Sequence, residues 1–75
     1  MEDRITKAIT AVLDSSAEPL ETKEVHSLVQ KKIGSITRTM LFYRLNVLRG
    51  DGKVKGKFVG PGKGVWIWWS VKWRR

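Results

Sequence analysis

Residues 35–49, SITRTMLFYRLNVLR, are the stretch that most constrains the fold of this chain. Thr37 can cap a helix in which Leu41, Leu45 and Leu48 recur at helical spacing, which predicts one buried stripe. The opposite face carries Thr39, Tyr43 and Asn46, flanked by Ile36, Phe42 and Val47, with Arg38, Arg44 and Arg49 toward its edges. These side chains are suited to contacting a ligand. The alternative is an ordinary amphipathic helix with partly exposed aromatic rings.

Apolar periodicity predicts two more helices before this stretch. The first is expected to be capped by Asp3, with a core face of Ile5, Ala8, Ile9, Val12 and Leu13. The second is expected to be capped by Thr22 and to end near Gly34, with Val25, Leu28, Val29 and Ile33 facing the core. Pro19 disfavours helix before it, so residues 19–21 supply a short extended segment. Two helices joined around Gly34 form a helix-turn-helix pattern.

The region after the third helix has the pattern of a β-hairpin. Lys53, Lys55 and Lys57 alternate with apolar or small residues over residues 53–59, which predicts a strand with one basic face. Residues 60–64, which include Pro61 and Lys63, form a flexible tip, and residues 65–73 form a second strand rich in β-branched and aromatic side chains. The alternative for the lysine face is a solubilising edge that discourages aggregation of the sheet.

Four tryptophans lie in the second predicted strand. Alternation places Trp69 and Trp73 on one face and Trp66 and Trp68 on the other. Because a domain of this size has little core with which to cover both faces, we expect Trp66 and Trp68 to be exposed as a candidate subunit interface. Stacking on unpaired bases and packing against the first helix are the alternatives.

The charge of the chain is large and unevenly distributed. The net charge is +8 over 75 residues. Residues 1–22 hold two basic and five acidic side chains, a net −3, whereas residues 23–75 hold thirteen basic and two acidic ones, a net +11. Such a field favours a polyanion as partner, and nucleic acid before a membrane surface.

Several other functions are disfavoured. The sequence has no cysteine and one histidine, His26, so we expect no metal or other cofactor and a structural role for His26. Residues 60–64 fail as a phosphate-binding loop, because that motif needs glycine at Lys57 and serine or threonine at Gly64. Ser15 and Asp14 form no recognisable nucleophile arrangement, so an enzyme is not expected. With neither a signal peptide nor an apolar run long enough for a bilayer, we expect an intracellular protein with no membrane or small-molecule partner.

The order of these elements resembles the winged-helix family of helix-turn-helix proteins. The resemblance is carried by residues 36–39, by Tyr43, Arg44, Leu45 and Leu48, by residues 51–54, and by residues 66–69. It implies an α+β fold in which residues 1–75 form a single domain, a three-helix bundle with a C-terminal β-hairpin wing. In that family the third helix, here about residues 37–49, enters the DNA major groove. The wing, here about residues 53–72, touches the backbone or the minor groove.

Within the superfamily, Tyr43, Pro61 and Trp66 are also similar to residues of domains that bind Z-form DNA. Those domains have asparagine where this chain has Thr39, and adjacent prolines shortly before the tryptophan.

These observations together predict a domain that binds double-stranded DNA, as a small transcriptional regulator or chromatin-associated protein. Lysine and arginine would neutralise phosphates, while the uncharged polar groups would reach base edges. The expected DNA-binding residues are Arg38, Thr39, Tyr43, Arg44, Asn46, Lys53, Lys55, Lys57 and Lys63. The alternatives are a protein-interaction module that uses the tryptophan-rich strand, with a homodimer as its simplest form, and a binder of RNA or Z-form nucleic acid.

Overall fold

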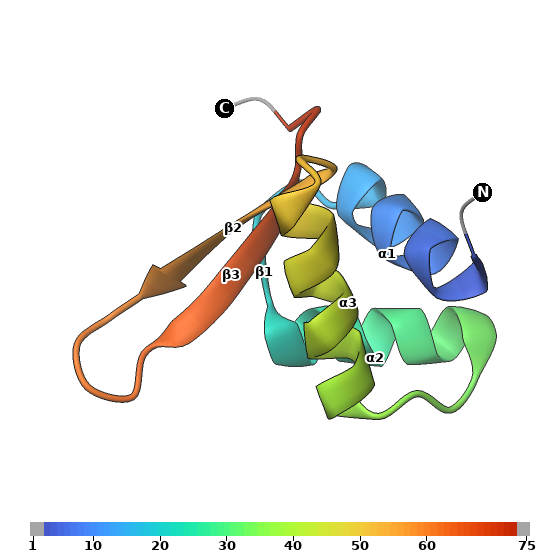
Figure 1. Cartoon of the computed structure of the whole chain (residues 1–75), viewed down its shortest axis with the longest axis horizontal. Coiled ribbons are helices and arrows are strands. Elements are labelled where there is room, and N and C mark those ends of the chain that lie inside the picture. The colour runs from blue at the N-terminus through green and yellow to red at the C-terminus, as the bar shows by residue number, and fades with distance from the viewer. Residues whose placement is uncertain (1–2, 74–75) are drawn as a thin grey trace.

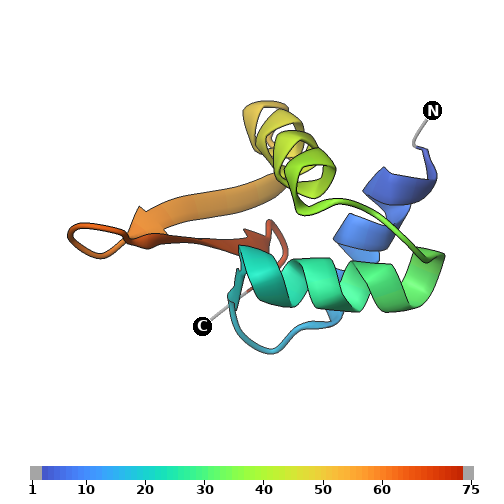
Figure 2. The same ribbon diagram turned by 90° about the horizontal axis from the view of Figure 1, so that it is seen from below.

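A computed structural model describes residues 3–73 of the chain. The elements are α1 (Arg4–Ser15), β1 (Leu20–Glu21), α2 (Thr22–Ile33), α3 (Arg38–Gly50), β2 (Val54–Val59) and β3 (Val65–Ser70). The three helices pack together on one side, and the hairpin of β2 and β3 extends away from them in both views (Figures 1 and 2). This is the predicted α+β architecture of three helices and a C-terminal wing.

The helix starts follow the local sequence at two of three positions. The side chain of Asp3 accepts from the backbone N–H of Thr6, and that of Thr37 accepts from the N–H of Met40, as predicted for N-caps. The prediction for α2 was wrong by one residue. Glu21 is its N-cap, the carboxylate of Glu24 accepts from the Glu21 N–H at 2.8 Å, and Thr22 is already helical. The hydroxyl of Thr22 is thereby available for a tertiary contact.

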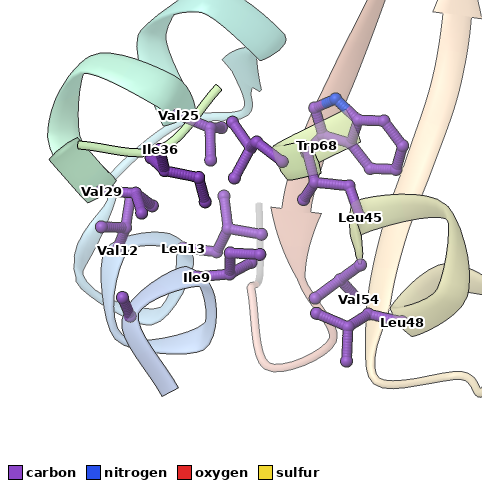
Figure 3. Close-up of a cluster of buried hydrophobic side chains, with 12 residues drawn as sticks. Ile9, Val12, Leu13, Val25, Val29, Ile36, Leu45, Leu48, Val54 and Trp68 are labelled. Carbon is purple, nitrogen blue, oxygen red and sulfur yellow. The ribbon is translucent and has the colours of Figure 1, made fainter. Parts of the chain in front are cut away.

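The core lies where the three helices meet the sheet (Figure 3). It contains the predicted stripe of α3, and Leu41 and Leu45 are fully buried. Two assignments were wrong. Leu28 is 39% exposed, whereas Ile36, expected beside the outer face of α3, is buried in the core. Ile36 precedes the helix, so its direction is set by the α2–α3 turn, where His26 Nε2 donates to the Ile36 carbonyl at 2.6 Å.

The sheet has three antiparallel strands in the order β1-β3-β2. Along the hairpin, Lys55 pairs with Trp69, Gly56 with Trp68 and Phe58 with Trp66. Both strands are shorter than predicted, since β2 begins after Lys53 and β3 ends at Ser70. The chain turns there, and the Trp73 N–H donates to the Ser70 carbonyl.

The expected exposure of Trp68 was wrong. Trp68 is fully buried against the helices, and its Nε1 donates to the Thr22 hydroxyl at 2.8 Å. Trp66, on the same face, is half-buried and packs at the edge of the core. The opposite face of β3 carries Ile67 and Trp69, and Trp69 makes an edge contact with Trp73. The two faces of β3 are therefore exchanged relative to the expectation.

Candidate nucleic-acid interface

The side of α3 that faces the wing is joined to it by aromatic contacts. Phe42 meets Trp66 and Trp68 edge-to-face, with ring centroids 6.4 and 6.0 Å apart. The guanidinium of Arg49 lies over the Trp66 ring, 5.1 Å from its centroid, which is within the range of a cation–π contact. These contacts fix the wing against α3 from Phe42 to Arg49, and the two elements diverge toward the wing tip (Figure 1).

The exposed side of α3 carries three of the predicted DNA-binding residues. Arg38 and Thr39 are exposed in its first turn, and Tyr43 is 67% exposed. Arg38 is four residues before Phe42, so it lies on the wing side of the helix. Arg38 therefore joins Arg49 along the space between α3 and the wing.

Arg44 is held by α1. Its guanidinium pairs with the carboxylate of Asp3 and donates to the Thr6 hydroxyl at 3.3 Å. The Thr6 backbone N–H and the Arg44 side chain together lower the pKa of Asp3 from 3.8 to about 2. These bonds tie the start of α1 to the middle of α3, so the charge of Arg44 is largely engaged within the domain.

Asn46 is half-buried on α3. Its Nδ2 donates to the Phe42 carbonyl at 2.9 Å, one turn earlier in the helix. This bond uses one of the two amide N–H groups and leaves the side-chain oxygen as an acceptor. One N–H of the Asn46 side-chain amide is therefore occupied within the helix, so a contact with a base would use an amide group that already makes this bond.

The wing lysines are all exposed, but they lie at different places along the wing. Lys55 and Lys57 are exposed and pair across the hairpin with Trp69 and Ile67, so they project from the face opposite Trp68 and α3. Lys63 is exposed in the loop at the wing tip. Lys53 is exposed just before β2. The predicted wing lysines therefore lie on the face of the sheet away from α3, just before β2 and at the tip of the wing.

Two exposed residues outside the predicted DNA-binding set lie on the same side, beside Phe42 and Trp66. Arg49 is exposed on α3, and Phe58 is 49% exposed on β2 with its ring 6.0 Å from that of Trp66. The sequence signal for Arg49 was its helical spacing from Arg38 and Phe42. For Phe58 the signal was the period-two pattern that places it on the face opposite the lysines. We call Arg38, Phe42, Arg49, Phe58 and Trp66 the α3–wing surface.

The exposed side of α3 continues past Tyr43 into an apolar strip. Met40 is 49% exposed and Val47 is 39% exposed, and with Tyr43 they recur at helical spacing along the helix. This strip was not predicted as a unit, although Val47 was expected beside the outer face. It is the part of α3 that resembles a protein contact more than a nucleic-acid contact.

Two of the residues similar to those of Z-form binders, Tyr43 and Trp66, lie on α3 and β3, and the ring contacts described for Trp66 are with other residues. The α3 ring that meets Trp66 is that of Phe42. Tyr43 follows Phe42 by one residue, so it points about 100° away around the helix.

Within residues 3–73, no group of three or more His, Cys, Asp or Glu side chains is placed to hold a metal ion. Over the same residues, every helix is too short or too polar to cross a bilayer.

Comparison with known proteins identifies the fold. No protein-family model matches the sequence, and no curated protein matches it. A solved structure is similar over 91% of this chain and 98% of its own chain, with a TM-score of 0.73 and 22% identity. It comes from a study of the DNA recognition and protein interaction domains of HOP2 and of the homologous DNA pairing properties of that protein. The helices, the wing and this similarity show that the chain has the winged-helix fold.

Proposed function

We propose that this domain binds double-stranded DNA, with the exposed side of α3 in the major groove and the wing along the adjacent backbone. The observation that carries the proposal is a set of exposed cations, with Arg38 and Arg49 on the wing side of α3 and Lys63 in the tip loop of the wing. Cations spaced along such a surface neutralise phosphates and release condensed counterions. The net charge of +11 over residues 23–75 supports the same ligand.

The structural similarity supports this ligand class independently. The similar chain comes from work on the DNA recognition and protein interaction domains of HOP2, and the match covers 91% of this chain and 98% of that one. For this chain, we infer that Thr39 and Tyr43 meet base edges or phosphates, because both are exposed on α3 and both carry hydroxyl groups.

The direct test is the salt dependence of binding to a labelled duplex of mixed sequence. If about five or six phosphates are neutralised, the logarithm of affinity should fall against that of salt concentration with a slope near −5. A slope flatter than about −2, or equal binding to an uncharged DNA analogue, contradicts the proposal. An RNA hairpin of the same length is the control, and tighter binding to it would favour the RNA alternative.

The proposed cellular role is that of a small transcriptional regulator or a chromatin-associated protein. Selection from a pool of random duplexes separates the two, because a regulator that reads bases enriches one sequence. If no duplex is preferred by more than a few-fold, α3 binds the DNA without base-specific recognition, which is the behaviour of an architectural protein.

A second candidate function is contact with a protein through the strip of Met40, Tyr43 and Val47. Exposed apolar side chains in a row are typical of a partner surface, and a second copy of this chain is the simplest partner. Light scattering tests it. A monomeric mass at high micromolar concentration excludes the homodimer, whereas a dimer that Tyr43→Ser converts to a monomer of unchanged stability supports it.

A further inference from the structure

Phe58 is held on the wing in an unusual position. A Cβ atom at Gly64 would lie 2.5 Å from Cζ and 2.7 Å from Cε2 of the Phe58 ring. The ring therefore lies directly against the backbone of Gly64, across the hairpin, in space that any other residue would fill. About half of the side chain is exposed. One side of the ring is thus supported by backbone while the remainder faces solvent.

The ring is also braced from the core. Phe58 meets Trp66 edge-to-face, and Trp66 stacks on Trp68 with centroids 5.3 Å apart and an interplanar angle of 20°. Trp68 is buried and bonded to Thr22. This row of rings runs from the core to the exposed half of the wing. A side chain so braced loses little conformational freedom when a flat ligand stacks on it.

The charges around Phe58 favour a nucleic acid over an apolar protein segment. Arg49 lies over the neighbouring Trp66, and Lys63 precedes Gly64 in the tip loop. From residue 52 to residue 73 the sequence has no acidic side chain. An aromatic surface flanked by cations matches a base with its phosphate, because the ring stacks on the base and the cations pair with the backbone.

We propose that Phe58 is a stacking platform for one unpaired nucleobase of a DNA strand that adjoins the duplex bound by α3. Bases inside a duplex are covered on both faces by their neighbours, so an unpaired base is the ligand whose ring is free to stack. The inference rests on the proposed function and adds a preferred substrate, which is a junction between double-stranded and single-stranded DNA.

The experiment compares two probes that share one duplex. The first probe is a dumbbell closed by a linker at both ends, and the second carries an unpaired tail of eight thymidines with 2-aminopurine at its first position. The wild-type protein should bind the tailed probe more tightly and change the 2-aminopurine fluorescence. Phe58→Leu should lower affinity for the tailed probe by about 5- to 150-fold, the range expected for one stacked base, and should leave the dumbbell within two-fold.

Two further variants separate stacking from structure. Phe58→Tyr keeps the ring and should keep the tail preference, whereas Val59→Ala removes an exposed apolar side chain from the other face of the wing and should change neither affinity. Two results would overturn the proposal while leaving duplex binding in place. One is an equal loss of affinity for both probes in Phe58→Leu, and the other is the absence of a preference for the tailed probe in the wild type. A blunt duplex that binds like the tailed probe would identify a terminal base pair as the occupant and also overturn it. Failure to bind either probe would instead reject the proposed function itself.

Discussion

The six-membered ring of Trp68 covers Gly56 on the neighbouring strand so closely that a Cβ there would lie 2.5 Å from Cε3 and Cζ3. Trp68 is fully buried, so its ring has no free space into which to move. The Cδ of Arg49 would lie only 3.3 Å from the same Cβ. The buried position of Trp68 and the glycine at residue 56 therefore depend on each other.

Gly56→Ala should destabilise the domain by about 1–3 kcal/mol, the usual cost of an added methyl group in a packed core. Urea denaturation measures the free energy of unfolding. Gly50→Ala is the matched control, since a Cβ at Gly50 meets nothing within 4 Å and the residue ends α3. It should be neutral or stabilising by up to about 1 kcal/mol. Equal stability of the two variants would show that the Trp68 ring moves freely.

Thr22→Val should also destabilise the domain. The substitution keeps the shape of the side chain but leaves the Nε1–H of buried Trp68 without its acceptor, which costs about 1–3 kcal/mol. Thr39→Val is the matched control, because Thr39 is exposed on α3. The check is the difference in unfolding free energy between the variants, and equal values would mean that the Trp68 hydrogen bond contributes nothing net.

The helices were predictable because their apolar spacing is local. The buried stripe of Leu41, Leu45 and Leu48 follows from the 3.6-residue period of a helix alone. The caps at Asp3 and Thr37 each depend on a hydrogen bond from the backbone N–H three residues later to the capping side chain. The Thr22 cap was wrong because Glu21 and Glu24 provide a competing start.

The sheet faces and the role of Arg44 were not predictable from spacing. The two-residue period of a strand predicts which side chains share a face. Contacts with residues distant in sequence decide which of the two faces packs on the core. For Trp68 that contact is with Thr22, 46 residues earlier, and for Arg44 it is with Asp3, 41 residues earlier. Alternation alone therefore left Trp68 equally compatible with burial and exposure.

The Asp3 carboxylate should make the stability depend on pH in the acid range. Because the pKa of Asp3 is lowered from 3.8 to about 2 in the folded protein, its ionised form stabilises the fold above pH 3.8. This stabilisation is lost as pH falls from about 4 toward 2. Asp3→Asn keeps a capping side chain but removes the charge. The difference in unfolding free energy between wild type and Asp3→Asn should be largest near neutral pH and shrink below pH 4, and a difference that is constant from pH 7 to 2 would contradict the assignment.

The last prediction concerns which cations contact the duplex. It depends on where each cation lies on α3 and on the wing. Arg38 lies on the wing side of α3 and Lys63 lies in the tip loop, whereas Lys55 and Lys57 project from the face of the sheet opposite α3. If the duplex lies against α3, Arg38→Ala and Lys63→Ala should each reduce the magnitude of the salt slope by about one. Lys55→Ala and Lys57→Ala should each change it by less than half as much.

These four variants share one readout, the slope of log affinity against log salt for a single duplex, and their melting temperatures check that each is folded. All four side chains are exposed, so truncation should leave the core intact. The reverse order of effects, with Lys55 and Lys57 dominant, would place the DNA against the outer face of the sheet beside Trp69. In that arrangement α3 would not enter the major groove, and Thr39→Val and Tyr43→Phe would leave affinity unchanged.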